Sequence, residues 1–203
     1  MNQAVTQAAS PRYQPSSDYV NDAFYDWLSE VSADLNQPVI RPQADPVIST
    51  ELTRRVTLES RLLDQQAFDV WLGLLSDECA YWIPPSQPAP ELRQTISLEF
   101  HDRRRLLDRV TRLRTGLAFS QLPHSRTSRL FSGLEIWSTP GRDDEWRARC
   151  NFVITESRVG HRRTLGGWNG FVFRREAGEL KIVLKQINLL DGDYPQGNNS
   201  FFL

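Results

Sequence analysis

From about residue 127 onward, apolar and polar residues alternate with a period of two, and this pattern restricts the second part of the chain to β-structure. In the clearest run, every second position is apolar: Trp146, Ala148, Cys150, Phe152 and Ile154. Successive side chains of a strand point to opposite faces, so the run predicts a strand with one face in a core. Glycines mark turns between such runs: Gly133, Gly141, Gly160 and Gly178. We therefore expect a long antiparallel meander.

The N-terminal part of the chain has helical spacing instead. Its first apolar residues recur at intervals of mostly three and four: Val20, Phe24, Trp27, Leu28, Val31 and Leu35. This spacing predicts a helix over about residues 18–36, which Ser17 or Asp18 could cap. Prolines then predict an extended linker: Pro38, Pro42 and Pro46. We expect a flexible tail over residues 1–17, an extension that comprises residues 1–49, and a single domain over residues 50–203.

Three more helices and two extended segments are expected before the meander. Leu52, Val56, Leu62 and Leu63 indicate a first helix. A second helix is indicated by Phe68, Trp71, Leu72 and Leu75, and Asp64 could cap its start. Residues 79–83 read as a strand, and residues 94–101 look extended. Asp102 could cap the third helix, whose shared face would hold Leu106, Leu107, Val110 and Leu113, and whose outward side would hold Arg104, Arg105, Asp108, Arg109 and Arg112.

Helices that precede a run of strands indicate an α+β fold. The run from residue 180 to residue 190 is apolar on both faces, which is typical of a strand covered on both sides. The glycine-rich stretch from Gly166 to Gly170 lies within a strand pattern and indicates a bulge or close packing. The expected architecture is therefore a set of N-terminal helices packed on a long, curved antiparallel sheet.

Composition excludes two classes of partner. The 203 residues carry a net charge of −1, which gives no general attraction to nucleic acid or to an anionic membrane. No apolar run approaches the roughly 18 residues of a membrane span, and the polar N-terminus lacks the apolar core of a secretion signal. Cys79 and Cys150 are too few for a disulfide framework, so we expect buried free thiols and a cytoplasmic location.

Metal-ligand motifs are missing from the sequence. A Rieske iron–sulfur centre needs two cysteines and two histidines, and no Cys-x-His or Cys-x-x-His pair occurs. A mononuclear iron site needs two histidines and a carboxylate around one metal. His101, His124 and His161 are widely separated, and none belongs to a helical His-x-x-x-His pair. We expect this chain to hold no metal and no cofactor.

Acid–base chemistry is the alternative function that the residue types allow. A curved sheet with helices on one side can enclose a pocket, and four residues could act there: His124, Asp102, Asp64 and Tyr81. A histidine beside a carboxylate is a usable base near neutral pH. The competing interpretation, which we favour, is that His124 hydrogen-bonds a loop and Asp102 caps a helix.

Two segments are candidates for contacts between subunits. The first is an arginine run whose candidate residues are Arg103, Arg104, Arg105, Arg109 and Arg112. Such a run could bind phosphate, but Asp102 and Asp108 flank and interrupt it. We therefore favour salt bridges within the chain or contact with an acidic partner surface. The second is the apolar end of the sequence: Phe201, Phe202 and Leu203. Exposure of three such residues would leave an adhesive patch, so they should be buried in the domain's own pocket or in an interface.

Several short segments follow one another in a fixed order: ESRLLD (59–64), FDVWL (68–72), AYWIP (80–84), ISL (96–98), LDRV (107–110), RLRT (112–115), SRTS (125–128) and the closing KIVL strand (181–184). Together they resemble the small (β) subunit of bacterial aromatic-ring-hydroxylating dioxygenases. Each is weak alone, but their order over residues 50–203 is specific. The N-terminal extension is longer than such subunits need, and its helix could either reach a neighbouring subunit as an arm or cover the chain's own domain.

The resemblance implies a cystatin-like α+β roll, related to the folds of ketosteroid isomerase and nuclear transport factor. It also implies a trimer of small subunits beneath three large subunits, an α3β3 hexamer. The large subunit would carry the Rieske 2Fe-2S cluster and the mononuclear Fe(II), with electrons from a reductase, sometimes through a ferredoxin. This chain would then be a non-catalytic support. The alternative of the same fold is a stand-alone isomerase or dehydratase that uses His124 and a carboxylate.

Overall fold

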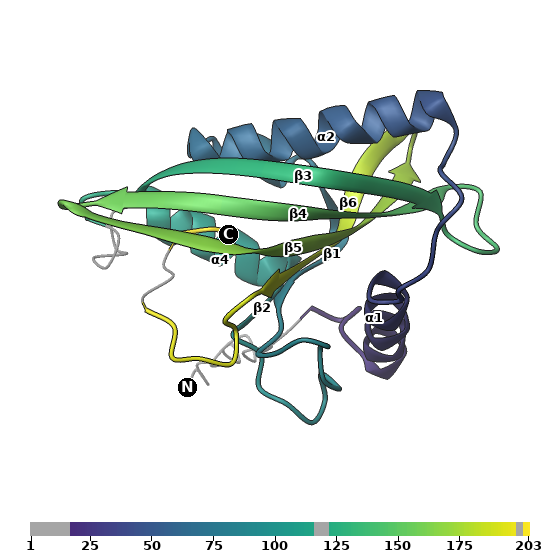
Figure 1. Cartoon of the computed structure of the whole chain (residues 1–203), viewed down its shortest axis with the longest axis horizontal. Coiled ribbons are helices and arrows are strands. Elements are labelled where there is room, and N and C mark those ends of the chain that lie inside the picture. The colour runs from purple at the N-terminus through teal and green to yellow at the C-terminus, as the bar shows by residue number, and fades with distance from the viewer. Residues whose placement is uncertain (1–16, 116–121, 198–200) are drawn as a thin grey trace, which may run out of the picture.

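The computed structural model describes residues 17–115, 122–197 and 201–203, in which a single twisted sheet carries helices on both faces (Figure 1). The predicted tail lies outside these residues, apart from Ser17. In chain order the elements are α1 (Asp22–Leu35), α2 (Pro46–Asp64), α3 (Phe68–Leu72), β1 (Leu75–Ile83), β2 (Glu99–Asp102), α4 (Arg103–Arg114), β3 (Arg126–Ser138), β4 (Glu145–Arg158), β5 (His161–Glu176) and β6 (Glu179–Leu189). The predicted α+β order is confirmed.

The sheet has six strands in the order β2-β1-β6-β5-β4-β3. Strands β3 to β6 form the predicted antiparallel meander. Strand β1 joins this meander in parallel beside β6, and β2 pairs with β1 in the antiparallel sense. Strand β6 therefore lies inside the sheet, and it is buried on both faces as its apolar run predicted.

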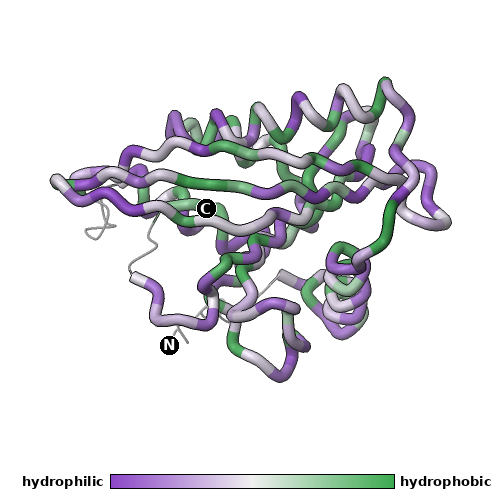
Figure 2. The backbone as a smooth tube through the Cα atoms, viewed as in Figure 1, coloured by the Kyte–Doolittle hydropathy of each residue, from purple (hydrophilic) through white to green (hydrophobic). Residues whose placement is uncertain are grey.

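The inner face of the sheet, which packs against α2, α3 and α4, forms the larger core. The alternation that predicted β4 is confirmed, because its apolar positions all belong to this core: Trp146, Ala148, Cys150, Phe152 and Ile154. Figure 2 shows hydrophobic and hydrophilic residues following one another along α2 and along the strands. This alternation is the expected pattern for elements with one face in a core.

Helix α1 packs on the opposite, outer face of the sheet. Its apolar side buries Leu28, Val31 and Leu35, which are 0%, 0% and 1% exposed, in a second core with Trp168 and Val172. The helix thus covers the chain's own sheet. It explains why strands beneath it, such as β6, are apolar on both sides.

The first turn of α1 begins later than predicted. Its cap is Asn21, whose side-chain oxygen accepts from the backbone N–H of Phe24, rather than Ser17 or Asp18. Ser17 is held elsewhere, because its backbone N–H donates to Asp102 at 2.6 Å. Asparagine caps a helix as well as serine or aspartate does, and residues 17–20 form a turn before it.

Asp64 does not cap α3, contrary to the prediction. It is the last residue of α2, and α3 begins after Ala67 without a side-chain cap. Its carboxylate instead accepts from the Thr127 hydroxyl at 2.8 Å and from the backbone N–H of Arg129 at 2.9 Å. These long-range hydrogen bonds, which fix the end of α2 on β3, could not be read from local spacing.

The buried face of α4 also differs from the prediction. Arg109 is buried with Leu106, Val110 and Leu113, whereas Leu107 is 45% exposed. A helix has 3.6 residues per turn, so positions i, i+3, i+4 and i+7 share a face. Arg109 belongs to the face of Leu106 by this rule, and Leu107 does not. The prediction placed Arg109 outside and Leu107 inside because of their residue types, whereas their positions on the helix indicate the reverse.

Close packing at Gly167 is confirmed, and it predicts a large difference between two adjacent glycines. A Cβ at Gly167 would lie 2.0 Å from the backbone oxygen of Asn188, whereas a Cβ at Gly166 would meet nothing closer than 3.5 Å. We expect Gly167→Ala to lower the free energy of unfolding by at least about 2 kcal/mol, because two paired strands must separate. Gly166→Ala is the control, with an expected change below about 0.5 kcal/mol. Equal urea midpoints for the two variants would contradict this packing.

Candidate functional site

The interior of the roll, where a pocket was the expected site, is filled by the segment of residues 201–203. Phe201, Phe202 and Leu203 are only 6%, 1% and 1% exposed, and they belong to the inner core. In Figure 1 the end marked C lies within the roll. Of the two alternatives for these residues, the structure places them in the domain's own pocket. Their side chains therefore contact the chain's own core in this structure.

Polar side chains hold the backbone of this segment. The carbonyl of Phe201 accepts from Arg109 Nη2 at 2.8 Å, and that of Phe202 accepts from Arg129 Nη2. The oxygen of Leu203 accepts from Lys185 Nζ at 2.8 Å and from the Tyr81 hydroxyl at 3.1 Å. The backbone N–H of Leu203 donates to the same hydroxyl at 2.8 Å. These donors come from α4, β3, β6 and β1, so the segment ties together distant parts of the chain.

Aromatic contacts hold the side chain of Phe202. Its ring centroid lies 4.7 Å from that of Trp71, 5.4 Å from that of Phe68 and 5.7 Å from that of Tyr81. The guanidinium carbon of Arg109 lies 4.2 Å from the centre of the same ring. Edge and tilted ring pairs, together with the cation–π contact, stabilise a ring beyond the burial of its area.

A buried ion pair closes the inner end of this site. Lys185 Nζ lies 2.7 Å from Glu59 Oε1, and both side chains are 2% exposed. The indole N–H of Trp71 donates to the same carboxylate at 3.1 Å. Burial lowers the pKa of Lys185 below its ordinary value, and the charge of Glu59 opposes that change. Burial likewise raises the pKa of Tyr81 well above its usual range, so its hydroxyl remains a donor.

Three of the four residues proposed for acid–base chemistry have separate structural partners. Asp102 caps α4 by accepting from the backbone N–H of Arg105 at 2.8 Å, as the favoured interpretation predicted. Asp64 holds β3, and Tyr81 is occupied by Leu203. His124 lines a narrow crevice beside the filled interior. Asp102, Asp64 and Tyr81 thus each hold a different part of the described fold.

The arginines of α4 divide into two groups. Arg109 points inward, and Arg103 donates to the backbone oxygen of Leu72 at 2.7 Å. The outer group is Arg104, Arg105 and Arg112, which line a depression of about 520 Å³. The depression also includes His101, Asp108 and Thr111. It is a basic, open surface on one side of the roll.

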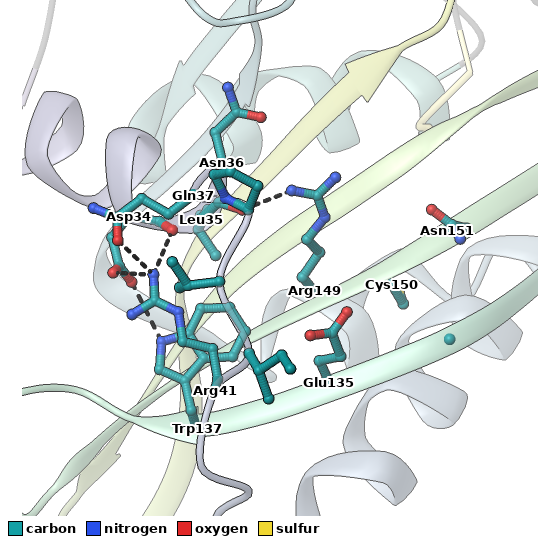
Figure 3. A pocket seen from close by; sticks show the side chains of 14 residues that line it. Asp34, Leu35, Asn36, Gln37, Arg41, Glu135, Trp137, Arg149, Cys150 and Asn151 are labelled. Carbon is teal, nitrogen blue, oxygen red and sulfur yellow. Dashed lines mark hydrogen bonds and ion pairs between the residues drawn. The ribbon is translucent and has the colours of Figure 1, made fainter.

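A groove of about 500 Å³ lies on the outer face, between residues 34–41 and strands β3 and β4 (Figure 3). Arg149 donates to the backbone oxygen of Leu35 at 2.7 Å and lies 3.9 Å from the ring centre of Trp168. At the other end, Arg41 Nη2 lies 2.5 Å from Asp34 Oδ1. These contacts attach α1 and its linker to the sheet, which gives the groove a structural role.

Burial raises the pKa of Asp34 on its own, but the hydrogen bonds and charges of Arg147 and Arg41 hold that pKa below its ordinary value. Arg147 Nη1 lies 2.7 Å from Asp34 Oδ2, and its side chain is 5% exposed. The carboxylate is therefore the counter-charge of a buried arginine on β4.

The potential metal ligands were also located. Cys79 and Cys150 are free and buried, and burial raises the pKa of each thiol to about 12. Across residues 17–115, 122–197 and 201–203, no group of three or more His, Cys, Asp or Glu side chains is arranged to hold a metal ion. Cys79 on β1 and Cys150 on β4 are separated in the sheet by β6 and β5, so the two thiols do not converge on one site.

The sequence model of the ring hydroxylating beta subunit family matches residues 58–193, well over half of the chain. The chain belongs to this family. A relative in the ring hydroxylating beta subunit family is the small oxygenase component of the p-cumate 2,3-dioxygenase system of Pseudomonas putida. It is 31% identical over 149 residues, which cover 71% of this chain and 81% of that protein.

Solved structures agree with this family and with the predicted fold. The beta subunit of the benzoate 1,2-dioxygenase from Burkholderia mallei is 26% identical, with a TM-score of 0.59, and the match covers 80% of this chain and 100% of that one. A protein of cystatin-like fold from Nostoc punctiforme is 13% identical, with a TM-score of 0.50, over 74% of this chain and 96% of that one. The cystatin-like α+β roll is thus confirmed. None of the helices in the described residues has the length and apolar character of a membrane span.

Sequence reasoning missed Glu59, Arg129 and Lys185, the charged residues of the interior. A signal was present at Lys185, which interrupts an apolar strand that is covered on both faces. A lysine in that position must find a buried partner. The identity of the partner, on a helix more than a hundred residues earlier in the chain, was not readable from spacing.

Proposed function

We propose that this chain is the non-catalytic small subunit of a multicomponent aromatic-ring-hydroxylating oxygenase, and that it supports the assembly of a larger, iron-containing subunit. The observation that carries the proposal is the family match over residues 58–193. The filled interior supports the non-catalytic role, because Phe202 and Leu203 occupy the space that a substrate would need.

In this proposal the Rieske 2Fe-2S cluster and the mononuclear Fe(II) belong to the large subunit. A Rieske centre needs cysteine thiolates and histidines as ligands. The donors of this chain do not fit it, because the buried Cys79 on β1 and Cys150 on β4 are separated in the sheet by β6 and β5. Electrons would reach the large subunit from a reductase, directly or through a ferredoxin.

We also propose that three copies of the chain form a trimer beneath three large subunits, in an α3β3 hexamer without nucleic acid or membrane partners. Co-expression with the large subunit, followed by light scattering on the purified complex, tests the proposal. The expected mass is that of three copies of each chain. Recovery of the two chains as separate species would contradict it.

The outer group of α4 arginines is the surface proposed to meet an acidic patch of the large subunit. Replacing Arg104, Arg105 and Arg112 with glutamate is expected to weaken binding of the large subunit at least about tenfold, with a strong dependence on salt. The free energy of unfolding of the chain itself should change by less than about 1 kcal/mol, because Arg105 and Arg112 are exposed and Arg104 pairs with the exposed Asp108 at 3.4 Å. Titration calorimetry at two salt concentrations measures the affinity.

The matched control is Arg54→Glu, which reverses an exposed arginine on α2. It should leave the affinity for the large subunit unchanged. If the triple variant binds the large subunit as tightly as this control does, the interface lies elsewhere on the roll.

A further inference from the structure

Residues 201–203 are held in the roll as a peptide ligand is held by a receptor. All three backbone oxygens of the segment accept hydrogen bonds from side chains of the surrounding body. Core segments usually satisfy their backbone groups within a helix or a sheet ladder instead. The surrounding side chains bind the backbone oxygens and the aromatic rings of the segment. These contacts do not require the segment to be part of a strand in the sheet.

The side chains that hold the segment are fixed by partners of their own. Arg109 is paired with Glu99, and Arg129 is paired with Asp64. Lys185 is likewise paired with Glu59, at 2.7 Å. Glu99 lies on β2, and Asp64 and Glu59 lie on α2, so all three carboxylates are outside the segment. Because each donor is anchored independently, the donors remain oriented when the segment is absent, and binding requires little further ordering.

The site also distinguishes between side chains. Phe202 enters a slot made by Phe68, Trp71 and Tyr81, with Arg109 over its ring. Phe201 is 6% exposed, and the guanidinium carbon of Arg163 is 5.4 Å from its ring centre. The slot fits an aromatic ring, and the aliphatic Leu203 that follows is 1% exposed.

We propose that the interior of the roll is a peptide-binding site, specific for an aromatic residue followed by an aliphatic one. It binds residues 201–203 as a separable ligand, and it accepts the same segment from a separate molecule, including a second copy of this chain. Peptide binding at this site goes beyond the proposed role in an oxygenase.

The test uses the full chain with a protease recognition sequence in place of residues 198–200, cleaved after folding. The released peptide is expected to remain with the folded chain through gel filtration. A fluorescent Ser-Phe-Phe-Leu peptide in excess should then replace it in a saturable manner. Its Ser-Phe-Ala-Leu counterpart should bind at least about tenfold more weakly, because the aromatic slot stays unfilled.

A matched variant tests the hydrogen bonds to Leu203. Tyr81→Phe keeps the ring but removes the hydroxyl that contacts Leu203, so the labelled peptide should bind more weakly to this variant. Tyr25→Phe, outside the site, should bind it normally. Two outcomes would overturn the proposal. In one, the folded, cleaved chain shows no binding of labelled peptide. In the other, the chain unfolds on cleavage, which would show that the segment is not separable from the fold.

Discussion

Removal of residues 1–45 is expected to lower the free energy of unfolding by at least about 5 kcal/mol, a large share of the stability of a typical domain. The first reason is the apolar side of α1. Leu28, Val31 and Leu35 are each at most 1% exposed, and fully burying one aliphatic side chain contributes about 1.5–3 kcal/mol. The deletion also exposes Trp168 and Val172 on the outer face of the sheet.

The second reason is the charge that the deletion leaves behind. Asp34 lies 2.7 Å from Arg147, which is buried on β4. Without α1 the guanidinium of Arg147 loses this counter-charge. Water must then solvate the guanidinium in place of Asp34. The loss of stability should therefore exceed the loss of apolar contacts alone.

Urea unfolding of the shortened chain measures this effect, and point variants locate it. Leu28→Ala should lower the free energy of unfolding by about 2–5 kcal/mol, whereas Ala33→Ser, on the exposed side of the same helix, should change it by less than about 0.5 kcal/mol. An arm that served only a neighbouring subunit would give a different result. In that case the isolated chain would keep its urea midpoint, and only the hexamer would dissociate.

Replacement of Glu59 by leucine is expected to lower the free energy of unfolding by about 3–5 kcal/mol. The reason is that Lys185, whose side chain is 2% exposed, would be left as a buried charge without its carboxylate partner. The double variant Glu59→Leu/Lys185→Met should recover most of this loss, because a matched apolar pair replaces a matched ion pair. Chemical unfolding of the wild type, the two single variants and the double variant gives the interaction energy.

The control for this prediction is an exposed pair of the same residue types. Lys181 Nζ lies 2.8 Å from Glu179, whose side chain is 67% exposed. Glu179→Leu should change the free energy of unfolding by less than about 1 kcal/mol, because water solvates the remaining lysine. Similar losses for Glu59→Leu and Glu179→Leu would show that burial of the Lys185 charge is not the cause.

The Glu59→Leu variant should also have a distinctive pH dependence. Burial lowers the pKa of Lys185 in the folded chain below the ordinary lysine value of 10.5, and the loss of Glu59 removes the charge that opposes this. Between the lowered pKa and 10.5, the unfolded chain binds more protons than the folded chain. The stability of the variant should therefore rise as the pH is raised toward 10.5. A stability that falls over that range would contradict this assignment.

Periodicity was sufficient to predict most of the fold, because the strands and helices bury one face each. The alternation of residues 146–154 predicted β4, and the doubly apolar run of residues 180–190 predicted a covered strand. The errors arose where distant contacts compete with local rules. Asp64 binds β3 instead of capping α3, and Arg109 turns inward because the interior supplies Phe201 and Glu99 as partners.

The site was less predictable for the same reason. The apolar segment of residues 201–203 indicated burial, but its location in the interior depends on donors from four elements. No spacing rule connects Tyr81 with Leu203, or Glu59 with Lys185, across more than a hundred residues. The family resemblance therefore supplied the function, and the structure showed that Asp64, Asp102 and Tyr81 hold other parts of the fold.

The iron content of the isolated chain, compared with that of its complex with the large subunit, tests most directly whether this chain supports an iron enzyme without donating a ligand. After incubation with Fe(II) and sulfide, the isolated chain should be colourless, contain no iron by mass spectrometry and leave an aromatic substrate unchanged. The complex should be red-brown and active. An iron–sulfur absorption spectrum in the isolated chain, or substrate turnover by it alone, would contradict the account.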